Sequence, residues 1–199
     1  MKKIIIGGLL ALSGAAMADG NKSFIMVDTS SEKDNRSSIA NEYIGANLTV
    51  GIKTPNKTEY SMKVGVSAKD KYDGTESISN NLEFKIKQSY DIGMFFLPYV
   101  AVRLGEKLSV DDDQHKNFTH YAFDAGAKVP LVGGLSLDVG ARYRNAFKSS
   151  KDYESTRVHA MFLYDVNEYN TLGLRYARSN ADNYEEERKS WRVHYQRNY

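Results

Sequence analysis

The chain has 199 residues, with 27 lysines and arginines against 25 aspartates and glutamates, and it has no cysteine. Without cysteine, neither a disulfide framework nor a thiolate site is available. The near balance of charge argues against nucleic-acid binding driven by bulk charge, and the length is enough for one domain.

The first 18 residues have the pattern of a secretory signal peptide. Lys2 and Lys3 form a positive start, residues 4–12 are apolar, and Ala16-Met17-Ala18 has the small-x-small cleavage pattern. The alternative is a membrane anchor, which needs about 20 apolar residues. We expect cleavage at the end of residues 1–18, leaving one mature domain at 19–199 with 25 basic and 25 acidic residues.

Ten segments of the mature chain alternate apolar and polar residues, which is typical of strands with one apolar face. The alternation is clear in GLSLDVGARYRNAF (134–147), where Leu135, Leu137 and Val139 alternate with Asp138 and Arg142. The first of these segments is short, and its residues do not predict which face is apolar. The expected strands lie at about 22–29, 39–53, 58–68, 81–87, 95–104, 118–129, 134–147, 157–166, 171–179 and 188–199.

The connections between these segments also alternate. Short turns near 54–57, 91–94, 130–133 and 167–170 separate longer, charged segments near 30–37, 69–77, 106–116, 148–154 and 180–187. Transmembrane barrels have short periplasmic turns and longer outer loops, and closure removes strand edges that a bilayer cannot satisfy. We predict an all-β fold: a closed antiparallel transmembrane β-barrel of ten strands in the outer membrane of a Gram-negative cell. Proline cannot donate to a β-ladder, so we place Pro98 near the start of its strand, at a bulge if one is present.

The last segment carries Trp191, Val193, Tyr195 and Tyr199 on one face, and an aromatic residue ends the chain. This resembles the C-terminal assembly signal of outer-membrane proteins, which implies the barrel-assembly machinery as a partner. The other partners that we expect are outer-membrane lipid, lipopolysaccharide and small anionic solutes, with no nucleic acid. We expect a monomer.

If the apolar faces contact lipid, the opposite faces line the lumen with eleven basic and five acidic residues. The bases are Lys53, Lys63, Lys85, Lys87, Arg103, Lys128, Arg142, Arg144, Arg157, Arg175 and Arg192. The acids are Glu59, Glu83, Asp124, Asp138 and Asp165. Rings of arginine and lysine select anions in pores, and arginine forks suit carboxylates. As candidate solute-binding residues we take Arg142, Arg144, Arg157, Arg103, Arg175, Arg192, Lys85, Lys87 and Lys63.

Two functions stay open at this point. A ten-stranded barrel is only slightly wider than eight-stranded barrels, which side chains fill. The lumen charges could therefore line a small porin-like channel for anionic solutes, or pair into a network that plugs it. In the second case the protein is a non-conducting structural or adhesive barrel that acts through its outer loops. Unpaired arginines facing water would favour transport.

An outer-membrane enzyme is a third, weaker hypothesis. His120 and Asp124 share the inner face of the sixth strand near its outer end, but no serine nucleophile is identifiable beside them. The run Asp111-Asp112-Asp113 lacks the spacing of a calcium loop, and no zinc or nucleotide motif is present. We expect no catalytic residue, metal or cofactor.

The succession of LSLDVGARYRNAF, a charged segment and RVHAMFLYDVN resembles the oligogalacturonate-specific porin family, whose relatives include an acetylneuraminate porin. The resemblance covers about residues 82–178. It implies an arginine-rich lumen that passes acidic oligosaccharides, with Arg142, Arg144 and Arg157 at matching positions. It also implies twelve strands, which is the alternative to our count of ten.

Overall fold

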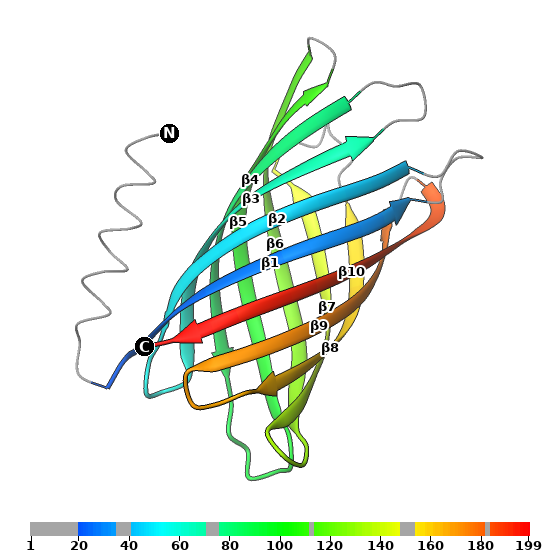
Figure 1. Cartoon of the computed structure of the whole chain (residues 1–199). Helices are drawn as coiled ribbons and strands as arrows, with labels where there is room; N and C mark the ends of the chain where they lie inside the picture. Colours follow the sequence, from blue (N-terminus) through cyan, green and yellow to red (C-terminus); the bar gives the residue numbers. More distant parts are fainter. Residues whose placement is uncertain (1–19, 35–40, 71–75, 112–113, 148–153, 182–183) are drawn as a thin grey trace.

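The computed structural model describes residues 20–34, 41–70, 76–111, 114–147, 154–181 and 184–199. Over these residues ten antiparallel strands form one closed barrel, as predicted (Figure 1). The strands are β1 (Lys22–Asp34), β2 (Asn41–Lys53), β3 (Thr58–Asp70), β4 (Glu76–Ser89), β5 (Leu97–Asp111), β6 (Gln114–Pro130), β7 (Leu135–Ala146), β8 (Ser155–Asp165), β9 (Asn170–Ala181) and β10 (Tyr184–Asn198). The expected signal peptide and residues 112–113 of the aspartate run lie outside the described residues.

Each strand pairs with its neighbours in sequence, and β1 pairs with β10 to close the barrel. The closing ladder runs without interruption from Phe24↔Asn198 to Asp34↔Arg188. The single register shift recorded among the described ladders lies between β9 and β10, at Tyr184 and Glu187. Closure gives every strand a hydrogen-bonded neighbour on both sides, and a bilayer core requires such pairing of backbone groups. No helix in the described part of the chain is long and apolar enough to cross a membrane.

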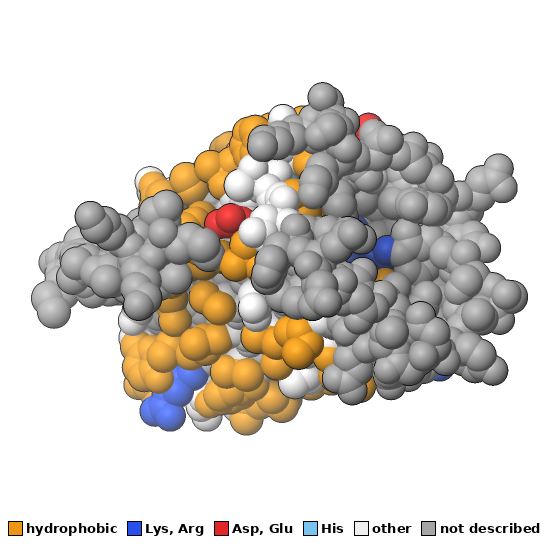
Figure 2. Space-filling model, turned by 90° about the horizontal axis from the view of Figure 1, so that it is seen from above, with side chains coloured by type: hydrophobic (Ala, Val, Ile, Leu, Met, Phe, Trp, Pro, Cys, Tyr) orange, Lys and Arg blue, Asp and Glu red, His pale blue; other side chains and the backbone are white. Residues whose placement is uncertain are grey.

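The outer surface of the barrel is apolar because alternate side chains of every strand point outward. Ile44, Val66, Phe123, Val158 and Val193 are each more than half exposed. Figure 2, which looks from above, shows hydrophobic side chains covering the visible flank of the barrel. The inner positions carry most of the charged residues, together with hydroxyl-bearing residues, histidine and glycine, and also some apolar side chains such as Phe24 and Met26.

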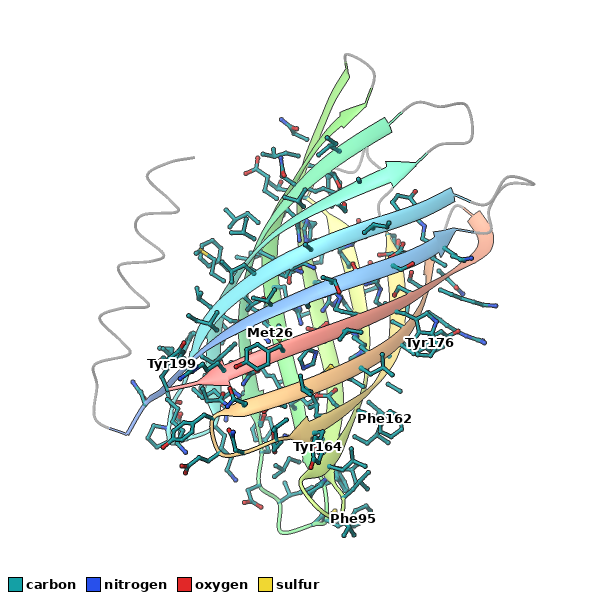
Figure 3. The ribbon with its side chains drawn as sticks, viewed as in Figure 1. Met26, Phe95, Phe162, Tyr164, Tyr176 and Tyr199 are labelled. Carbon is teal, nitrogen blue, oxygen red and sulfur yellow. The ribbon has the colours of Figure 1, made fainter. Side chains whose placement is uncertain are left out.

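Aromatic side chains lie toward both ends of the outer surface, and Figure 3 labels Tyr164 and Tyr199 near one end and Tyr176 toward the other. Tyr164 and Tyr199 lie at the end where both termini of the barrel and the short turns are found. Tyr176 and Trp191 lie toward the other end, with ring centroids 4.8 Å apart. Aromatic girdles of this kind mark the two lipid–water interfaces of transmembrane barrels.

Local chemistry closes the short turns. The β6–β7 turn ends on Gly133 and Gly134, whose φ angles of 69° and 79° suit glycine. Lys57, in the β2–β3 turn, forms a 2.7 Å ion pair with Asp91 in the β4–β5 connection. Donation from Lys57 and from the backbone of Gly93 lowers the pKa of Asp91 below its usual value.

Pro98 is the second residue of β5, near the strand start as predicted, and both neighbouring ladders run past it without a recorded bulge. Its carbonyl accepts a 2.9 Å hydrogen bond from the backbone of Tyr90. The end opposite the turns differs from expectation, because β1 runs to Asp34 and β5 to Asp111. Ladder hydrogen bonds join backbone groups, so pairing continues where the apolar alternation has ended.

Candidate functional site

A cavity of about 900 Å³ occupies the lumen, lined by residues from all ten strands. Its described lining includes fifteen basic and eight acidic side chains, so positive charge is in excess. All nine predicted solute-binding residues lie on this lining, as do Lys53 and Lys128. The period-two pattern placed these residues, because successive side chains of a strand point to opposite faces.

Sequence reasoning missed seven charged residues of the lining. They are Lys22, Asp28, Glu32, Lys57, Lys107, Glu168 and Arg188. Asp28 and Glu32 belong to β1, whose sequence does not predict which of its faces points inward. Asp28 is 1% exposed and accepts a 2.6 Å hydrogen bond from Asn47 of β2, and Arg192 lies 3.3 Å from its carboxylate.

Much of the wall formed by β3 to β7 is a network of ion pairs. The Glu83 carboxylate lies 3.1 Å from Lys63 and 2.5 Å from Arg103. Asp124 continues the network, at 2.5 Å from Arg103 and 2.6 Å from Arg142. The buried carboxylates fix both guanidinium groups against the wall, because paired Arg–carboxylate contacts are directional.

A second pair of contacts meets at Glu32, and one of them joins strands that are not neighbours in the barrel. Arg157 of β8 reaches Glu32 of β1 at 3.3 Å, past β9 and β10. Arg188 of β10 lies 3.5 Å from the same carboxylate. The Arg157–Glu32 contact therefore spans part of the lumen toward the end opposite the short turns.

Arg175 differs from the arginines just described. No carboxylate of the described chain forms an ion pair with it, and its Nε is buried without a hydrogen-bond partner. Arg192 is its register partner on β10, and Arg142 and Arg157 are also close enough to repel it. This group of four, which we call the arginine cluster, contains more positive charge than the acids around it offset.

Tyr99 lies flat against the wall above two glycines. A Cβ on Gly126 would lie 2.5 Å from the Tyr99 hydroxyl, and one on Gly140 would lie 2.8 Å from it. The hydroxyl donates to Asp138 at 2.8 Å, and Lys87 sits 3.8 Å from the ring centroid. Glycine thus leaves room for a large inward side chain to lie along the wall and not across the lumen.

The histidines of the lumen do not form the pair considered from the sequence. His120 is 1% exposed and lies 3.8 Å from Glu83, while the Asp124 carboxylate is occupied by Arg103 and Arg142. A different histidine, His159, contacts Asp138 at 3.1 Å.

Several solved outer-membrane barrels share this fold. An outer membrane channel from Pseudomonas putida F1 has a TM-score of 0.55 at 7% identity, covering 90% of this chain and 95% of that one. The β domain of the Bordetella autotransporter BrkA has a TM-score of 0.53 at 11% sequence identity, covering 90% of this chain and 99% of that one. The NanC porin has a TM-score of 0.52 at 10% sequence identity, covering 86% of this chain and 98% of that one.

These likenesses show the fold, which channels and autotransporter domains share. No family model and no curated protein matches the chain. The resemblance to the oligogalacturonate-specific porins therefore finds no support from a family match. The ten strands of the described chain also differ from the twelve that this resemblance implied.

Proposed function

We propose that the protein is a narrow outer-membrane channel that passes small anionic solutes through its basic lumen. The observation that carries the proposal is the arginine cluster, and above all Arg175, which lines the lumen cavity and has no ion-pair partner in the described chain. If the lumen were plugged by a network in which every base is paired with an acid, no arginine would lack a carboxylate partner.

The ion pairs and the charge excess have different roles in this proposal. Glu83 and Asp124 hold the guanidinium groups of Arg103 and Arg142 against the wall, so these side chains line the lumen and do not extend across it. The unbalanced charge of Arg175 then attracts an anion between β7 and β10. Arginine rings favour anions in pores, and a guanidinium fork suits carboxylates, so small organic acids and acidic oligosaccharides are the solutes we infer.

The remaining parts of the proposal follow from the sequence. The chain is exported with a cleaved signal peptide, inserted through its last strand by the barrel-assembly machinery, and active as a monomer without catalytic residues or cofactors. Its nine candidate solute-binding residues are those placed on the lumen wall above.

Planar-bilayer recording of the refolded mature protein tests the channel proposal, with the reversal potential measured in a salt gradient. We expect discrete openings that favour anions, and we expect Arg175→Gln to reduce the anion-to-cation permeability ratio at least twofold. The matched control is Arg197→Gln, which removes a charge from the outer surface. Wild-type selectivity retained in Arg175→Gln would overturn the role of the cluster.

A non-conducting barrel that acts through its outer loops is the second candidate. The contact from Arg157 to Glu32 favours it, because it spans part of the lumen between β8 and β1, which are not neighbouring strands. A silent bilayer, with heat-modifiable migration showing that the protein is folded, would establish this alternative in place of the channel.

A further inference from the structure

A basic row crosses the outer surface at the loop end of three neighbouring strands. Lys33 of β1 is in register with Lys189 of β10, which is in register with Arg178 of β9. All three side chains are exposed on the outside of the barrel. In register with the row are Val158 of β8 on one side and Glu42 of β2 on the other.

Aromatic rings lie directly below this row. Trp191 and Tyr176 are in register with each other, two residues nearer the middle of the barrel than Lys189 and Arg178. This offset is about 5 Å along the barrel axis for tilted strands. Trp191 is 53% exposed, and Arg178 donates a 2.9 Å hydrogen bond to the Tyr176 hydroxyl. The outward direction of Tyr176 is visible in Figure 3.

The rings and the lysines together border a groove of about 370 Å³. Its lining consists of Ser31, Lys33, Tyr176, Lys189 and Trp191. Lys189, in the middle of the row, has no ion-pair partner in the described chain. At the turn end of the same three strands, the described outer surface carries one base, Arg197.

We propose that this groove binds the phosphorylated sugar headgroup of a glycolipid in the outer leaflet. The basic row faces the height at which lipid phosphates lie, and clustered bases at a membrane surface attract anionic headgroups. Below it, the exposed ring of Trp191 offers a flat apolar face with a polar edge, which suits contact with a sugar ring. The site lies outside the lumen, so the experiments that test it do not depend on whether the lumen conducts.

Trp191 is the only tryptophan of the chain, so its fluorescence reports on this groove alone. We would titrate the refolded protein in nonionic detergent with lipid A, a bisphosphorylated glucosamine lipid, and with the same lipid after removal of its phosphates. We expect a saturable change in emission with lipid A, and an apparent affinity at least tenfold weaker without the phosphates.

The variants test the row directly. Lys33→Gln with Lys189→Gln should weaken the response to lipid A roughly tenfold, whereas Lys33→Arg with Lys189→Arg should retain it. Arg197→Gln is the matched control on the opposite rim and should bind as the wild type. Equal binding of the two lipid forms, or unchanged affinity in the Gln variant, would overturn the site. Heat-modifiable migration confirms folding of each variant.

Discussion

At the scale of single residues, the free space of the lumen depends on side chains that lie flat. Tyr99 is 6% exposed although it points inward, because the wall beneath it is built from Gly126 and Gly140. His194 lies over Gly173 in the same way. A Cβ at these glycines would enter space that the ring occupies.

Gly126→Ala should therefore move the Tyr99 ring toward the lumen. The new methyl would meet the Tyr99 hydroxyl and the Val139 carbonyl, and we expect lower single-channel conductance and a loss of about 1–3 kcal/mol from overpacking. Urea unfolding and bilayer recording measure both effects. Adding Tyr99→Ala should restore the conductance; a double variant no different from Gly126→Ala would show that the ring is not the cause.

At the scale of the strands, alternation predicts facing only where the two faces differ in polarity. In β7, Leu137 and Val139 oppose Asp138 and Arg142, so the lumen face can be read from the sequence. In β1 the inward residues include Phe24 and Met26, which are as apolar as the outward Ile25 and Val27. The inward acids of β1 therefore could not be assigned.

Contacts between strands that are distant in sequence depend on how the barrel closes and on the stagger between its strands. The positions of the strands in the sequence do not determine either. The pairing of Arg157 with Glu32 joins residues 125 positions apart. It arises because β1 closes on β10 and brings the loop end of β1 near β8. The absence of an ion-pair partner for Arg175 in the described chain is equally a result of this arrangement.

Glu32→Gln tests the contact between β1 and β8. The substitution removes the carboxylate that Arg157 and Arg188 share, so we expect the Arg157 side chain to become mobile, and conductance and anion preference to rise together. Bilayer recording in a salt gradient measures both quantities. Ser30→Ala, at a neighbouring inward position of β1, is the control, and an unchanged conductance in Glu32→Gln would mean that these contacts do not limit flow.

At the scale of the whole molecule, charge is distributed unevenly: the lumen has an excess of basic residues, although the chain as a whole is nearly neutral. Fifteen bases and eight acids line the described lumen, whereas the sequence as a whole has 27 bases and 25 acids. An anion entering the pore thus meets a field that the overall charge of the protein does not reveal. Electrostatic selectivity of this kind acts over the Debye length, which is about 10 Å at 0.1 M salt and about 3 Å at 1 M.

The anion preference should accordingly depend on ionic strength. We expect the chloride-to-potassium permeability ratio to be higher in gradients near 0.1 M than in gradients near 1 M, because concentrated salt screens the arginine cluster. Reversal potentials at the two concentrations, with the same tenfold gradient, measure the change. Arg175→Gln should show a weaker dependence on salt than the wild type. A ratio that stays constant between the two concentrations would mean that pore size, and not lumen charge, selects the solute.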